Sequence, residues 1–178
     1  MEELDFKALL DRFRKDGFTR GEKVILANFG TNQTLLSVIF DKPSRLQLVD
    51  QRESDGVINR LVNLIYGYTI CCIANTVIPR ARNRADVILD ITAGQLGLGQ
   101  IVVTHNLPNR RVLLDVGRDR LSFWRTYAIE GKEVYLKIHE HFPRQPFLDA
   151  GWEVGWIEPE MKPTLNYYKS HGGGKDAK

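Results

Sequence analysis

The sequence is poor in cysteine and has no long apolar run. Its two cysteines, Cys71 and Cys72, are neighbours, so on a strand their side chains would point to opposite faces. This excludes a disulfide framework and a cysteine-based metal site, and it indicates two small apolar side chains in a reducing compartment. No apolar stretch reaches the roughly 18 residues that a membrane-spanning helix needs, so we expect no membrane partner.

A secretory leader and a strong charge of either sign are also missing. Residues 1–5 are acidic and lack a basic segment followed by an apolar one, which favours the cytoplasm. The 25 basic residues barely exceed the 22 acidic ones, a balance compatible with anionic small molecules. Three arginine clusters lack the interleaved aromatic side chains of a base-stacking surface. We therefore expect no nucleic-acid partner and keep nucleic-acid binding as a weaker alternative.

Several common catalytic motifs are absent as well. The chain has no Gly-x-Ser-x-Gly sequence, which argues against nucleophilic hydrolysis. Residues 96–100 contain two glycines but follow a predicted helix and lack a complete dinucleotide-binding fingerprint, so we interpret them as a loop. His139 and His141 share one strand face as a metal pair can, but no third ligand is evident, and we expect them to face solvent without a metal.

Length and hydrophobic patterning indicate one domain. The 178 residues are 43% hydrophobic, enough for a substantial core, and we place a single domain over residues 1–170 with a disordered tail at 171–178. Residues 5–15 and 83–96 have helical periodicity, whereas 23–28 and 34–40 fit a helix or a strand. Extended patterns connected by short turns favour an antiparallel sheet. They occupy residues 46–49, 57–66, 69–78, 111–116, 124–129 and 134–142.

Two charged residues fall on strand faces that should be buried. Residues 134–142 alternate apolar and polar side chains, and Glu140 falls on the apolar face. Residues 58–64 alternate in the same way, and Arg60 falls among the apolar side chains. A buried charge is costly unless it is paired or used for binding. An ion pair between Glu140 and Arg60, and a ligand site that uses both, are equally good explanations at this point.

Short motifs spread along residues 24–144 carry a family resemblance. They are Ile25–Thr31, Ile58–Leu64, Ala74–Pro79, Leu98–Ile101, Gly117–Asp119 and Glu140–Phe142. In order and spacing the chain resembles chorismate pyruvate-lyase, in particular its diverged, chorismate lyase-like branch. The resemblance implies an α+β fold with a single antiparallel sheet of about six strands and helices packed on one side, around an enclosed product site.

The resemblance also implies an enzyme and its site. The reaction would be the elimination of pyruvate from chorismate to give 4-hydroxybenzoate, driven by aromatisation of the ring and needing no cofactor. Arg60 would grip the ring carboxylate with the backbone N–H of Leu98, and Glu140 would lie at the hydroxyl end of the ring. The segment around Asn32 would close the site. A second cation should meet the enolpyruvyl carboxylate, for which the candidates are Arg118 and Arg125.

The chain departs from the family at several positions. Asn75 stands where the proteobacterial enzymes have arginine, Asn32 where they have an apolar residue, and Gly97 where a proline is usual. These positions bear on substrate identity and on closure of the site rather than on the fold. The main alternative is a non-catalytic domain of the same fold that binds an aromatic acid or a sugar phosphate, as in the effector domains of some transcription regulators. We expect a monomer or a homodimer in either case.

Overall fold

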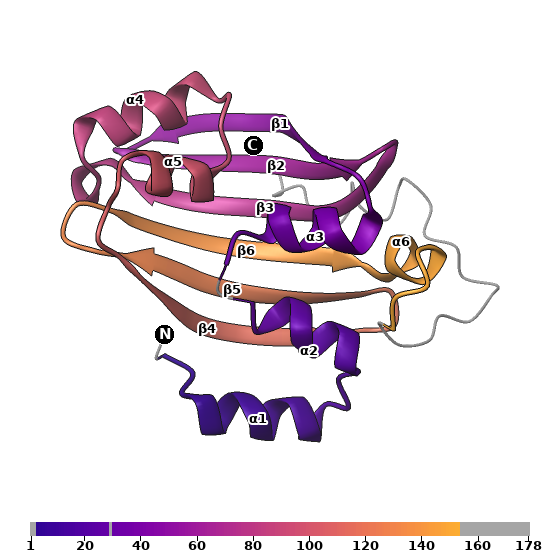
Figure 1. Cartoon of the computed structure of the whole chain (residues 1–178). Helices are drawn as coiled ribbons and strands as arrows, with labels where there is room; N and C mark the ends of the chain where they lie inside the picture. Colours follow the sequence, from indigo (N-terminus) through magenta and orange to yellow (C-terminus); the bar gives the residue numbers. More distant parts are fainter. Residues whose placement is uncertain (1–2, 29, 154–178) are drawn as a thin grey trace, which may run out of the picture.

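The described residues form one six-stranded antiparallel sheet with helices on one side (Figure 1). A computed structural model describes residues 3–28 and 30–153 of the chain. The strand order is β1-β2-β3-β6-β5-β4, so two consecutive three-strand meanders meet where β3 pairs with β6. The predicted fold class is thereby confirmed. The predicted tail at 171–178 and the expected end of the domain at residue 170 lie outside the described residues.

The strands agree with the alternating patterns in number and order. One is much longer than predicted, because β1 continues past the apolar residues 46–49 along the exposed edge of the sheet as a polar segment. The strands are β1 (Ser44–Ser54), β2 (Val57–Tyr66), β3 (Thr69–Pro79), β4 (Arg110–Arg118), β5 (Ser122–Glu130) and β6 (Tyr135–Pro143).

The helices settle the two segments that periodicity left open. Residues 23–26 and 34–40 belong to helices, Ala27 and Asn28 follow the end of the first, and each of these helices begins earlier in the chain than the apolar pattern does. The helices are α1 (Phe6–Lys15), α2 (Arg20–Leu26), α3 (Asn32–Phe40), α4 (Ala85–Ala93), α5 (Leu98–Thr104) and α6 (Arg144–Asp149), with a 3-10 turn at Arg80–Arg82.

The loop interpretation of residues 96–100 is wrong. Gly97 is the N-cap of α5, and its backbone N–H donates a hydrogen bond of 3.1 Å to Oε1 of Gln100. The predicted helix at 83–96 instead ends at Ala93, because Gly94 adopts a left-handed conformation with φ of 74°. The paired glycines therefore mark the start of a short second helix, which packs against α4.

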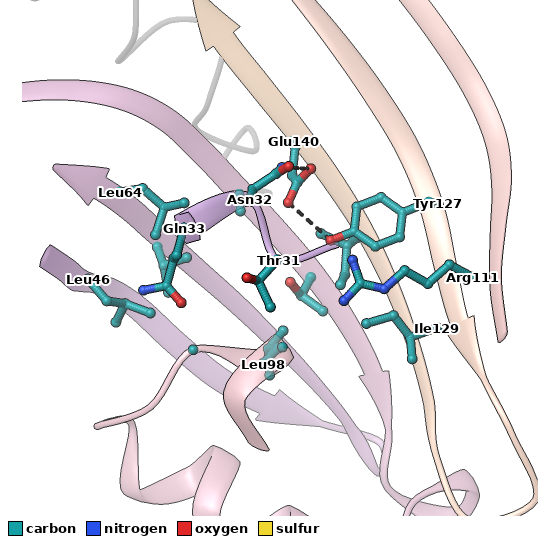
Figure 2. Close-up of a pocket in the computed structure, with 16 residues that line it drawn as sticks. Thr31, Asn32, Gln33, Leu46, Leu64, Leu98, Arg111, Tyr127, Ile129 and Glu140 are labelled. Carbon is teal, nitrogen blue, oxygen red and sulfur yellow. Dashed lines mark hydrogen bonds between the residues drawn. The ribbon is translucent and has the colours of Figure 1, made fainter. Parts of the chain in front are cut away.

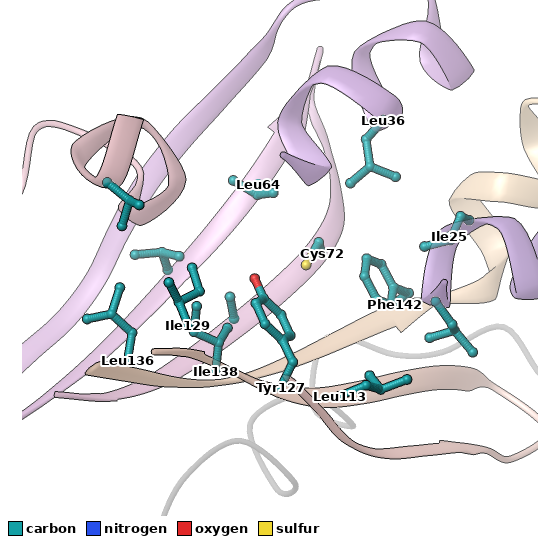
Figure 3. Close-up of a cluster of buried hydrophobic side chains, with 14 of the residues drawn as sticks. Ile25, Leu36, Leu64, Cys72, Leu113, Tyr127, Ile129, Leu136, Ile138 and Phe142 are labelled. Carbon is teal, nitrogen blue, oxygen red and sulfur yellow. The ribbon is translucent and has the colours of Figure 1, made fainter. Parts of the chain in front are cut away.

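Side-chain alternation assigns one face of the sheet to the core. The helices lie over the near face of the sheet in Figure 1, with α4 and α5 over the first meander. Buried apolar side chains from β2, β3, β5 and β6 meet those of α2 and α3 beneath the helices (Figure 3). Phe142 and Ile25 are fully buried there, as is Cys72, which fills space as the sequence indicated. Period-2 burial therefore also carries Arg60 and Glu140 inward.

The opposite face of the sheet makes one close contact that explains a glycine. Gly117 on β4 lies directly across from Trp124 on β5, and a Cβ atom added at Gly117 would lie 2.3 Å from the indole ring. We expect Gly117→Ala to lower the free energy of unfolding by about 1–3 kcal/mol, because the ring must leave its position. Urea denaturation measures this effect. In a Trp124→Ala background the same change should cost less than about 0.5 kcal/mol, and an equal cost in both backgrounds would contradict the explanation.

Candidate functional site

A cavity of about 70 Å³ lies between the sheet and the helices, across the junction of the two meanders. Its wall is mainly apolar side chains of the strands, and it is capped by the start of α3 and the start of α5 (Figure 2). Polar groups enter it from only a few positions. The lining residues are Thr31, Asn32, Gln33, Leu46, Val62, Leu64, Ala74, Thr76, Gly97, Leu98, Gly99, Arg111, Tyr127, Ile129, Ile138 and Glu140.

Glu140 lines this cavity and is tightly held. Its Oε2 atom accepts a hydrogen bond of 2.6 Å from Nδ2 of Asn32 and one of 2.7 Å from Nε of Arg125. Its Oε1 atom accepts a hydrogen bond of 3.0 Å from the hydroxyl of Tyr127. Figure 2 shows Asn32 and Tyr127 on either side of the carboxylate. The inward carboxylate is therefore compensated by three donors, which is what burial of a charge requires.

The ion-pair partner of Glu140 is Arg125 and not Arg60. Arg125 and Glu140 are directly opposite each other on β5 and β6, and they are only 3% and 5% exposed. Burial is the largest single effect and lowers the pKa of Arg125, but the charge and hydrogen bond of Glu140, together with Tyr127 and Cys72, leave the pKa raised. Nη1 of Arg125 donates to backbone carbonyls at the end of α2, including that of Leu26 at 3.0 Å. Arg125 thus joins β6 to α2 and does not line the cavity.

Arg60 is buried without an acidic partner among the described residues. Its side chain is 1% exposed, and Nη2 donates to the carbonyl of Leu96 at 2.8 Å. Nε and Nη1 have no hydrogen-bond partner in the part of the chain that is described. Burial lowers the pKa of Arg60. The expectation that Arg60 itself lines the cavity is wrong, since it lies just behind the wall, next to Thr76 of β3 and the residues preceding Leu98.

The first residues of α3 close the cavity. Asn32 is 6% exposed and holds Glu140, while Gln33 packs on the start of α5, where a Cβ atom added at Gly97 would lie 2.7 Å from Oε1 of Gln33. Leu98 lines the cavity, as expected. An apolar cavity of ~150 Å³ holds one benzene molecule. At about 70 Å³ this cavity is smaller than that, so an aromatic acid needs more room than its walls leave.

Two polar residues of the cavity, Arg111 and Tyr127, were not among the predicted site residues. Arg111 belongs to one of the arginine clusters of the sequence, and its guanidinium group points into the cavity from β4, next to Tyr127 (Figure 2). The alternation of β5 contained a signal for Tyr127, because it shares a face with Arg125 and Ile129. The bulge between Leu113 and Asp115 hid Arg111, since it shifts the alternation within β4.

The remaining predicted positions lie away from the cavity. Arg118 is close to Gly17 and to Glu22, whose Oε2 atom lies 3.4 Å from its Nη1 atom, so it does not join Glu140. Asn75 is exposed on the opposite face of the sheet, so its difference from the family does not reach the cavity.

The two histidines follow the predicted outward face of β6. His139 is exposed, and its Nδ1 atom lies 2.9 Å from the hydroxyl of Thr126. Within residues 3–28 and 30–153, no three His, Cys, Asp or Glu side chains gather as a metal site would require. Over the same residues, no helix has the length and hydrophobicity to cross a membrane.

Comparisons with known proteins add no relative to this picture. No protein-family model matches the chain, and no curated protein has significant similarity to it.

Proposed function

We propose that this protein is a cofactor-free lyase that eliminates pyruvate from chorismate and releases 4-hydroxybenzoate. One observation carries the proposal: a buried glutamate lines the apolar cavity, and a buried arginine with no acidic partner among the described residues lies just behind its wall. Arg60 is on β2 and Glu140 on β6, with β3 alone between them, and Glu140 is in register with Val62 rather than with Arg60. Their backbones are therefore about 9–10 Å apart across the sheet and about 7 Å apart along the strands, or about 12 Å in all. This spacing suits an aromatic ring with a carboxylate at one end and a hydroxyl at the other.

Arg60 is suited to the carboxylate end. Nε and Nη1 of its guanidinium group are unpaired within the described chain, and Arg–carboxylate pairs are strong when they are bidentate and shielded from water. A carboxylate bound there would compensate the buried charge of Arg60. Leu98, at the adjacent wall, brings its backbone to the same end of the cavity.

Glu140 is suited to the reacting end. The elimination removes a proton from the ring carbon that bears the hydroxyl, and the electron pair of that C–H bond completes the aromatic ring. The neighbouring carbon–oxygen bond breaks, and the departing enolpyruvate takes a proton on its terminal carbon to become pyruvate. The Glu140 carboxylate, fixed by Arg125 and Tyr127, would accept the proton or orient the hydroxyl. The position between the sheet and α3 would keep water away from the substrate ring during the elimination.

The direct test is incubation of the purified protein with chorismate. We expect 4-hydroxybenzoate, measured by chromatography, and pyruvate, measured with lactate dehydrogenase, to appear in equal amounts above the uncatalysed rate. Arg110→Met is a control variant for this assay and should form both products at the rate of the unmodified protein. Arg110 neighbours Arg111, but it is exposed and paired with Glu130 at 2.6 Å. Product at the uncatalysed rate with the unmodified protein would refute the proposal.

A second candidate, a binding domain that does not consume its ligand, is favoured by one observation. Three donors of the protein already hold the Glu140 carboxylate. This arrangement suits a fixed hydrogen-bond acceptor for a ligand as well as it suits a catalytic base. Titration calorimetry with 4-hydroxybenzoate and chorismate separates the two functions. Binding of both ligands without any product formation would support the binding domain.

A further inference from the structure

Four arginines bear on the site: Arg111 lines the cavity, Arg60 lies just behind its wall, and Arg118 and Arg125 lie outside it. Arg125 is paired with Glu140 at 2.7 Å, and Arg118 lies 3.4 Å from Glu22. Arg60 and Arg111 form no ion pair with any described carboxylate. A guanidinium group that faces a largely apolar cavity without a counter-ion has an unbalanced charge, which an anionic ligand would compensate.

Arg111 approaches the cavity from a different wall than Arg60. It extends from β4 at one edge of the sheet, whereas Arg60 belongs to β2 near the other edge. The Arg111 guanidinium lies 6.0 Å from the centre of the Tyr127 ring. Its Nη2 atom lies 3.9 Å from the place where a Cβ atom added at Gly99 would be. Figure 2 shows the guanidinium group directed toward Thr31, which also lines the cavity. Arg111 therefore enters the cavity from the β4 side, while Arg60 lies behind the wall on the β2 side.

The contacts of Arg111 leave it available to a ligand. Nη1 donates to the backbone carbonyl of Gly30, a neutral group in the segment that closes the cavity. A carboxylate is a stronger acceptor for a guanidinium group than a peptide carbonyl is. An anion entering beside Thr31 would therefore compete successfully for Arg111. Arg111 is half-buried, so the replacement of the Gly30 carbonyl by a ligand carboxylate would take place close to solvent. A side group attached to the ring of the ligand would lie at this position.

We infer that Arg111 binds the second carboxylate of a dianionic ligand, while Arg60 binds the first. This inference rests on the proposed function and specifies it, because chorismate has one carboxylate on the ring and one on the enolpyruvyl ether. Arg111 thus replaces Arg118 and Arg125 as the residue that meets the enolpyruvyl carboxylate. Arg111 is a specificity residue, since it distinguishes the dianionic substrate from the monoanionic product and favours release of the product once the ether is cleaved.

The test uses two stable ligands of similar shape that differ by one charge. 3-(Carboxymethoxy)benzoate has a ring carboxylate and an ether-linked carboxylate, and 3-propoxybenzoate has only the first. Calorimetry on the unmodified protein should show tighter binding of the dianion. Arg111→Met should weaken dianion binding roughly 10- to 100-fold and change monoanion binding less than about 3-fold. Arg110→Met, on the same strand, should change neither.

The outcomes separate this inference from the proposed reaction. Equal weakening of both ligands by Arg111→Met, no weakening of either, or no preference of the unmodified protein for the dianion would overturn the role of Arg111. A preference for the dianion that depends on Arg111, in a protein without lyase activity, would support the role of Arg111 and refute the reaction. With an active enzyme, Arg111→Met should raise KM for chorismate more than it lowers kcat.

Discussion

Replacing Arg125 by methionine is expected to lower the free energy of unfolding by about 3–5 kcal/mol, because the change leaves the Glu140 carboxylate buried without its cation. The guanidinium group is 3% exposed, and its contacts with the carbonyls of Ile25 and Leu26 would also be lost. Urea denaturation at neutral pH, followed by circular dichroism, measures the change. An effect of this size would take a large part of the stability of a domain this long.

The cost should depend on Glu140. In the double variant Arg125→Met with Glu140→Gln, the uncompensated charge is gone, and at least half of the lost stability should return. Arg80→Met is the matched control, because Arg80 pairs with Glu53 at 2.8 Å on the surface, where water screens the pair and it contributes little to stability. A purely additive double variant, or a cost at Arg125 no larger than at Arg80, would show that the ion pair is not the cause.

Arg60→Met is expected to abolish ligand binding without unfolding the protein. Methionine fills a similar volume and removes two buried nitrogen atoms, Nε and Nη1, that have no described partner. The free protein should therefore be unchanged or more stable, by up to about 2 kcal/mol, because no buried charge remains to be compensated. Affinity for 4-hydroxybenzoate should fall roughly 100-fold or more, as a bidentate contact to the carboxylate is lost. Calorimetry and thermal unfolding measure the two effects.

This opposite response of binding and stability is what marks a functional residue. A residue that only supports the fold would lose stability and binding together. Arg60→Lys provides the comparison, since it keeps the charge but not the paired N–H groups, and should bind the ligand weakly. Loss of stability in Arg60→Met, with ligand affinity unchanged in the protein that remains folded, would assign Arg60 to the carbonyls of Gly94 and Leu96 alone.

Much of the fold could be predicted from alternation, because burial on one face leaves a period-2 record in each strand. That record identified β2 to its ends and placed Glu140 inward. It did not identify the α5 helix, because Gly97 and Gly99 at the start of this helix have low helix propensity and favour a loop. Its stability comes instead from packing against α4, which is a tertiary effect that the local sequence does not contain.

Naming the partner of Glu140 required the register of the β5–β6 hairpin. The expected strand ends at residues 129 and 134 would place Phe123 opposite Glu140, whereas the hairpin closes with Glu130 opposite Tyr135 and so places Arg125 there. Arg60 was the expected partner because its side chain points inward. Alternation assigns a residue to a face of the sheet, but it does not determine which strands are adjacent. The position of Arg111 could not be found in this way, since the bulge in β4 breaks the count.

The order of the strands also has a consequence for how the site comes into existence. Each meander forms from hairpins that are local in sequence, whereas β3 and β6 join residues more than 60 positions apart, such as Ala74 and Glu140. Contacts that close long loops form late in folding, because the chain entropy must be lost before they compensate for it. The cavity takes its walls from both meanders, so neither half alone contains the complete site. Ligand-binding capacity should therefore arise in the last step of folding, as a property of the assembled chain alone.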